Sequence, residues 1–151
     1  MKLVQGNIWE FENKLDYVCI TTNSIVKRDG SLVMGAGIAK EANLKVNGLA
    51  KDFGQQILNK NLHGDFYGLL LAKEKYIAFQ TKLHYKNESP LDVVERSCEM
   101  LERLSKRHPE KSFGLPFPGV SNGRLSPKVV YPFLVKLPDN VIVYHINKLE
   151  L

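Results

Sequence analysis

The sequence predicts a three-layer α/β/α domain with a mixed, mostly parallel central sheet. Short apolar runs alternate along the chain with longer amphipathic segments, which is the order that successive β-α units produce. Two of the runs are separated only by residues 72–75, which indicates a hairpin and one antiparallel pair. Because no repeat, low-complexity tract or linker interrupts this order, residues 1–151 are expected to form a single domain.

Six apolar runs have the length of strands. They lie at Leu3–Val4, Tyr17–Thr21, Tyr67–Leu71, Tyr76–Phe79, Ser112–Leu115 and Val141–Ile146. Each is short and is followed within one or two residues by polar or turn-forming residues, as expected for buried strands. The third and fourth runs form the hairpin.

Three segments, at about 37–58, 90–107 and 127–136, show the periodicity of helices. In the first, apolar residues recur at steps of three and four: Ile38, Ala42, Val46, Leu49, Ala50, Phe53 and Ile57. Gly48 is expected to bend this helix or divide it in two. The other two begin with Ser89-Pro90 and Ser126-Pro127, which predict a serine cap and a proline at the first helical position.

Composition places the chain among ordinary globular proteins, with 44% hydrophobic and 25% charged residues. No apolar run approaches the roughly 20 residues of a membrane span, and the amino terminus lacks the pattern of a signal peptide. We therefore expect a cytoplasmic protein with no membrane partner, and reduced structural thiols at Cys19 and Cys98. The four histidines are scattered, so neither a metal site nor a cofactor is predicted.

The net charge of +5 favours approach to polyanions. The densest basic segment, residues 96–111, interleaves basic with acidic residues, which is typical of a solvated helix face with ion pairs. A basic nucleic-acid-binding module and a metabolic enzyme for another nucleotide stay open as alternative functions.

Two glycine-bearing loops have the composition of phosphate-binding loops. The first, Met34-Gly35-Ala36-Gly37-Ile38-Ala39, opens the first predicted helix. The second runs from Pro116 to Leu125 and precedes the last helix. Glycine lets the backbone turn several N–H groups toward one anion, and a helix start leaves its own N–H groups unpaired. Together, the two loops could bind two phosphates. The alternative interpretation of the first loop is a helix start that needs small residues for packing.

A polar run, Thr21-Thr22-Asn23, ends the second predicted strand. Ligands of α/β sheets bind beyond the carboxyl ends of strands, where the two glycine loops also fall. The amide of Asn23 both donates and accepts, which suits ribose hydroxyls. A turn residue that bonds its own backbone is the alternative interpretation.

In order along the chain, these motifs resemble those of macro domains, the ADP-ribose-binding family. Gly6-Asn7-Ile8 is similar to the family's Gly-Asp-Ile, residues 21–23 to its strand-end asparagine motif, and the two glycine loops to its phosphate loops. The segment 79–85, Phe-Gln-Thr-Lys-Leu-His-Tyr, resembles Phe-Pro-Thr-Lys-x-His-Trp of the DNA ADP-ribosyl hydrolase antitoxins known as DarG. The chain resembles most the branch of DarG and the terminal ADP-ribose protein glycohydrolases.

The resemblance implies a macro-domain-like fold and binding of ADP-ribose or a related nucleotide by a monomer. ADP-ribosylated protein and nucleic acid are the further partners that it implies. It assigns ligand binding to Asn7, Ile8, Thr22, Asn23, Gly35, Ala36, Gly37, Ile38, Gly119, Val120, Ser121, Asn122, Gly123 and Arg124. Asn23 is also the candidate catalytic residue.

The sequence departs from the family at three positions that bear on activity. Asn7 replaces an acidic residue that contacts adenine, and its amide oxygen can accept the same hydrogen bond. Asn43 and Gly123 stand where the related hydrolases have a lysine and an aspartate. We therefore expect weak or absent de-ADP-ribosylation. An ADP-ribosyl hydrolase, an ADP-ribose 1″-phosphate phosphatase and an inactive ADP-ribose reader all stay open.

A longer segment, 24–33, separates the asparagine motif from the first loop. Its Arg28-Asp29-Gly30 predicts a tight turn, and the segment is expected to form a small flap beside the distal ribose. Asp29 and Lys82 are the first residues to test if catalysis is found.

Overall fold

The computed structural model describes residues 1–151 and contains one six-stranded sheet. Its spatial order is β1-β6-β5-β2-β4-β3. The strands are β1 Lys2–Gln5, β2 Tyr17–Thr22, β3 Leu69–Ala72, β4 Tyr76–Gln80, β5 Phe113–Pro116 and β6 Val141–His145. All neighbours run parallel except β3 and β4, which form the hairpin. This confirms the predicted mixed, mostly parallel sheet.

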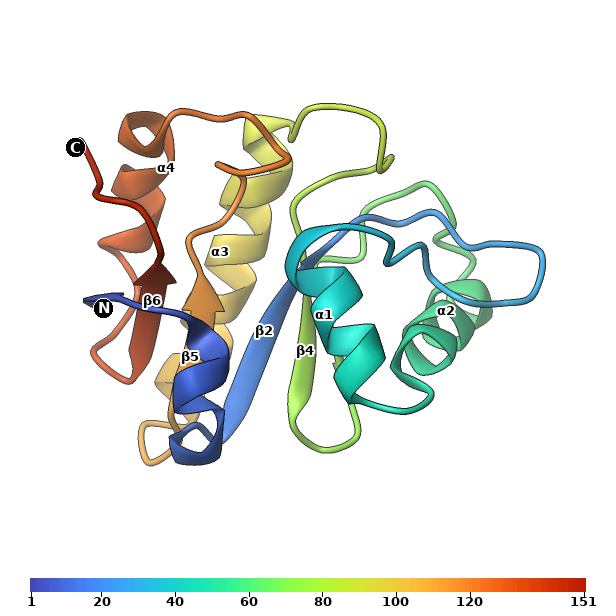
Figure 1. Cartoon of the computed structure of the whole chain (residues 1–151), viewed down its shortest axis with the longest axis horizontal. Helices are drawn as coiled ribbons and strands as arrows, with labels where there is room; N and C mark the ends of the chain where they lie inside the picture. The colour runs from blue at the N-terminus through green and yellow to red at the C-terminus, as the bar shows by residue number, and fades with distance from the viewer.

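Helices cover both faces of the sheet (Figure 1). One face carries α1 (Gly37–Lys45), α2 (Leu49–Asn59) and the 3₁₀ helix η1 (Ile8–Lys14). The other carries α3 (Leu91–Arg107) and α4 (Pro127–Leu134). The three-layer architecture is therefore confirmed. None of these helices combines the length and apolar character that crossing a bilayer requires.

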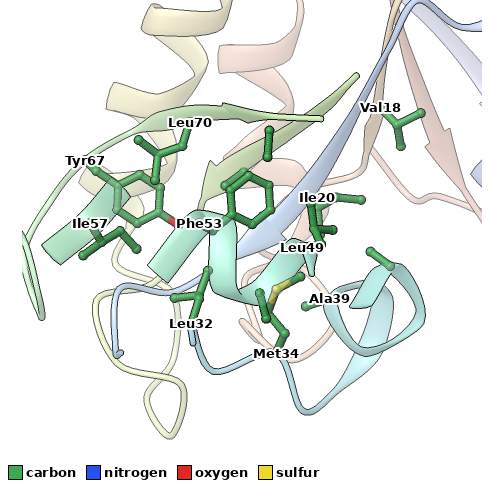
Figure 2. Close-up of a cluster of buried hydrophobic side chains, with 14 of the residues drawn as sticks. Val18, Ile20, Leu32, Met34, Ala39, Leu49, Phe53, Ile57, Tyr67 and Leu70 are labelled. Carbon is green, nitrogen blue, oxygen red and sulfur yellow. The ribbon is translucent and has the colours of Figure 1, made fainter. Parts of the chain in front are cut away.

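The alternation of side chains along β2 separates the two cores. Val18 and Ile20 point into the core beneath α1 and α2, whereas Cys19 points into the core beneath α3 and α4. Figure 2 shows the first core, in which Phe53 of α2 packs between the sheet and the segment that carries Leu32. Cys19 and Cys98 are both buried free thiols, as predicted.

Gly48 divides the first predicted helix in two. It adopts a left-handed conformation with φ of 78° between α1 and α2, a conformation that glycine reaches without strain. The predicted cap at Ser126 is confirmed, since its hydroxyl accepts a hydrogen bond from the Lys128 N–H at 3.3 Å.

The predicted cap at Ser89 is wrong. Pro90 occupies the cap position of α3, and the buried Ser89 hydroxyl makes no hydrogen bond. Ser89 packs against the second loop instead: its N–H donates to the Gly123 carbonyl at 3.0 Å, and its Oγ lies where a Cβ on Gly123 would be only 2.2 Å away. This bond ties residue 89 to the second glycine loop instead of to the helix that follows it. Helix η1, whose short span carries no clear apolar period, was not predicted either.

Candidate functional site

A cleft of about 590 Å³ lies at the carboxyl ends of β2, β4 and β5. Both glycine loops and the end of β2 line it, as the topology of parallel strands requires. Ten of the fourteen predicted ligand-binding residues are among its lining residues: Thr22, Asn23, Gly35, Ala36, Gly37, Ile38, Gly119, Ser121, Asn122 and Arg124. The structure thus brings together segments that lie about a hundred residues apart in the sequence.

The first loop leads directly into α1. Ala36 is the cap residue of this helix and has no side chain that can accept a hydrogen bond, so the first N–H groups of α1 are not capped by a side chain. Gly37 has φ of +56°. Together with the positive end of the helix dipole, this backbone is suited to an anion.

The second loop folds back on itself through its own backbone. The Leu125 N–H donates to the Gly119 carbonyl at 2.8 Å, and the Arg124 N–H donates to the Ser121 carbonyl at 3.1 Å. Gly119 and Arg124 both have positive φ, of 79° and 61°. These bonds fix the loop without using the amide of Asn122.

The two loops face each other across the cleft. A Cβ atom placed on Gly37 would lie 3.2 Å from the Asn122 Nδ2 atom. Gly35, in contrast, has no atom within 4 Å of the position that its Cβ would take. The cleft is therefore narrow beside Gly37 and open beside Gly35.

Asn23 is held at the end of β2 by its own turn. Its Oδ1 accepts a hydrogen bond from the Ile25 N–H, and its Nδ2 donates to the Val33 carbonyl, both at 2.9 Å. These bonds are those of the turn residue that the sequence left open as an alternative. One Nδ2 hydrogen has no partner in the protein, and the side chain, 8% exposed, lines the cleft.

Tyr67 forms hydrogen bonds with two residues at this end of β2. Its hydroxyl is hydrogen-bonded to the Thr22 hydroxyl and donates to the Asn23 carbonyl at 2.7 Å. Burial raises the pKa of Tyr67, so the hydroxyl stays protonated and keeps its role as donor. The sequence offered no signal for this contact beyond the apolar run that Tyr67 opens.

Positive side chains border the cleft on the β4 side. Lys82, Lys86 and Arg124 are all lining residues. The Lys82 ammonium donates to the Asn122 carbonyl at 3.0 Å and so connects the end of β4 to the second loop. Burial, and next the charge of Arg124, lowers the pKa of Lys82. Tyr85 lines the same side, with Lys86 over its ring.

Four predicted ligand-binding residues are not among the lining residues of the cleft: Asn7, Ile8, Val120 and Gly123. Asn7 caps η1, since its Oδ1 accepts a hydrogen bond from the Trp9 N–H at 3.0 Å. Ile8 is buried in the core. Contact of Asn7 with an adenine ring stays a prediction.

The positions at which the related hydrolases carry a lysine and an aspartate do not face the cleft. Asn43 accepts a hydrogen bond from the Ala50 N–H at 3.2 Å and lines a neighbouring hollow instead. A Cβ on Gly123 would lie 2.2 Å from the Ser89 Oγ and 2.5 Å from the Gly119 carbonyl oxygen. The backbone around Gly123 therefore has no space for a side chain.

Asp29 also lies away from the cleft lining. It sits in the turn of a small hairpin, in which Val26 bridges to Leu32 and the Lys27 N–H donates to the Ser31 carbonyl. This confirms the predicted tight turn. Residues that line the cleft without having been proposed as ligands include Val33, Thr81 and Phe117, each of which adjoins a predicted motif.

Solved structures identify this arrangement as the macrodomain fold. The macrodomain of Thermus aquaticus DarG superposes with a TM-score of 0.73 and that of Mycobacterium tuberculosis DarG with 0.74. Each is 22% identical to this chain, and each alignment covers 97% of both chains. No family profile and no curated protein sequence matches the chain.

A structure of Thermosipho africanus DarTG in complex with ADP-ribose is similar to the same extent, with a TM-score of 0.74 and 22% identity. The alignment covers 100% of this chain and 43% of that one. The chain thus spans less than half of DarTG and corresponds in extent to the DarG macrodomains.

Proposed function

We propose that this protein binds ADP-ribose, or a molecule that carries it, in the cleft between the two glycine loops. The observation that carries this proposal is that loops 34–39 and 116–125 line one cleft together with Asn23 at the end of β2. The unpaired N–H groups at the start of α1 suit a diphosphate, and the free Nδ2 hydrogen of Asn23 suits a ribose hydroxyl. The likeness to an ADP-ribose complex of the same fold supports this ligand.

Release of ADP-ribose from protein or DNA is expected to be weak or absent. Neither a lysine nucleophile nor an activating carboxylate is supplied from positions 43 and 123, which are turned away from the cleft. The only ammonium groups in the lining are those of Lys82 and Lys86, and Lys82 donates to two carbonyls. The site therefore corresponds better to a reader of ADP-ribose than to a fast hydrolase.

Substitution at Gly35 tests the binding site. A valine there meets no protein atom near its Cβ, so the variant is expected to fold like the wild type. Because Gly35 lines the cleft, the added side chain is expected to reduce the space for a ligand. We expect ADP-ribose to raise the melting temperature of the wild type and to leave that of Gly35→Val unchanged. Gly37→Val should also block binding, but its φ of +56° adds backbone strain, which makes Gly35 the cleaner position. Wild-type binding by a folded Gly35→Val protein would show that the ligand lies elsewhere.

A release assay tests the chemistry. The substrates are ADP-ribosylated thymidine, glutamate-linked ADP-ribose and ADP-ribose 1″-phosphate, each with Asn23→Ala as the comparison. We expect little or no release from the first two. Brisk turnover of either would mean that other residues supply the missing groups, and Lys82 would then be tested first.

A further inference from the structure

A second hollow, of about 430 Å³, adjoins the cleft. It lies between the 26–32 hairpin and the junction of α1 with α2, and shares Val33, Met34 and Gly35 with the cleft. This three-residue segment lines both spaces. Asn23, the predicted ribose contact, donates a hydrogen bond to the carbonyl of Val33, the first residue of this shared segment. The segment therefore begins next to the expected position of the ribose.

The polar side chains of the second hollow are almost all hydrogen-bond donors. Lys27 enters from the hairpin and Lys51 from the first turn of α2, and neither forms an ion pair. The amide nitrogens of Asn43 and Asn47 donate to no protein acceptor. No carboxylate is among the lining residues. Two cations and two free amides from separate elements thus border one open hollow, and all four residues are exposed.

One acidic group of the 26–32 hairpin, Asp29, is already engaged in a hydrogen bond. Asp29 accepts a hydrogen bond from the Ser31 N–H at 2.9 Å, which lowers its pKa, and the charges of Lys27 and Lys51 contribute further. Asp29 lies outside the hollow and forms no ion pair with either lysine. Asp29 thus lies near enough for the two lysine charges to act on it, but it gives neither lysine an ion-pair partner.

We propose that the second hollow binds a phosphate group carried by the substituent on the distal ribose of the bound ADP-ribose. This inference rests on the proposed function, because the ribose must lie at Asn23 for its substituent to pass over residues 33–35. Lys27 and Lys51 supply the charge, and the amides of Asn43 and Asn47 supply directed hydrogen bonds. Position 43, where hydrolases carry a lysine, contributes here to recognition of the substituent.

The test compares ADP-ribose with ADP-ribose 1″-phosphate by calorimetry. We expect the wild type to bind the 1″-phosphate at least about tenfold more tightly, as charge-assisted hydrogen bonds allow. The double variant Lys27→Ala, Lys51→Ala should lose this preference and keep its affinity for ADP-ribose. A matched double variant, Lys60→Ala with Lys128→Ala, removes the same charge from positions outside both spaces and should keep the preference.

A second pair of ligands identifies the source of the phosphate. ADP-ribosylated thymidine is compared with and without a 5′-phosphate, and a preference for the phosphorylated form points to a nucleotide substituent. If neither pair shows a preference, or if the double variant retains it, the inference is wrong while ADP-ribose binding stands. If ADP-ribose itself does not bind the wild type, the proposed function fails and the inference fails with it.

Discussion

Asn23 makes two hydrogen bonds inside the protein and still lines the cleft. The sequence left a turn role and a ligand role as alternatives, and the geometry allows both. Its Oδ1 and one Nδ2 hydrogen hold the backbone, while the second Nδ2 hydrogen is available to a ligand. If a ribose binds here, as we propose, Asn23 couples its binding to the shape of the strand end.

Asn23→Ala is expected to lower the affinity for ADP-ribose by about tenfold or more, because one direct hydrogen bond and the anchoring of residues 25 and 33 are lost. Asn140→Ala is a matched control: its amide also donates to backbone carbonyls, those of Ser105, His108 and Lys111, far from the cleft. Melting curves and calorimetry are measured for both. If both variants lose stability and neither loses affinity, Asn23 is a structural residue only.

Gly123 is constrained by packing that sequence alone does not reveal. Its neighbours in space are Ser89 and Gly119, so the absence of an aspartate there reflects a tight backbone as well as a missing catalytic group. Gly123→Ala is expected to lower the free energy of unfolding by about 1–3 kcal/mol through overpacking. Gly35→Ala, where a Cβ meets nothing within 4 Å, should leave it nearly unchanged. Equal stability of the two variants in denaturant titrations would show that the second loop is not tightly packed.

At the scale of elements, the periodic patterns predicted most of the structure. The steps of three and four in the apolar residues predicted α1 and α2, because this period follows directly from helix geometry. The short apolar runs predicted the strands. Strand ends differ by one or two residues, as for β3, which begins at Leu69 instead of Tyr67. The predicted cap at Ser89 is wrong because this residue packs against Gly123, a long-range contact that the local sequence does not indicate.

The hairpin 26–32 packs closely against α2 at Gly54. A Cβ on Gly54 would lie 2.0 Å from the Gly30 carbonyl oxygen and 2.8 Å from the Leu32 nitrogen. The Leu32 N–H also donates to the Ala50 carbonyl at 2.9 Å. These contacts fix the hairpin next to Val33, the first residue of the segment that lines both spaces.

Gly54→Ala is therefore expected to push the hairpin away from α2. Overpacking of about 1–3 kcal/mol corresponds to a fall in melting temperature of roughly 3–10 °C for a chain of this size. Affinity for ADP-ribose should fall as well, because Val33 lines the cleft. Gln55→Ala, at the exposed neighbouring position, is the control. An unchanged melting temperature would mean that the hairpin is not held by this contact.

At the scale of the whole molecule, the topology creates the site. Strands β2, β4 and β5 are neighbours and parallel, so the segments that follow them meet at one edge although they lie far apart in sequence. The sequence predicted this convergence from the motifs. The sequence could not predict that Asn43 lines the second hollow instead of the cleft. That placement depends on the division of the helix at Gly48 and on the packing of the 26–32 hairpin against α2.

Calorimetric titration of the wild-type protein with ADP-ribose tests the central claim most directly. We expect one site per chain, with an affinity that changes little between low and high salt because the phosphates are held by backbone N–H groups in a cleft. A single-stranded oligonucleotide serves as the comparison, since binding through several phosphate contacts weakens by about 10³-fold or more over the range from 50 to 200 mM salt. Saturable one-to-one binding of ADP-ribose at both salt concentrations supports the account. No heat with ADP-ribose, together with tight and salt-sensitive binding of the oligonucleotide, would contradict it.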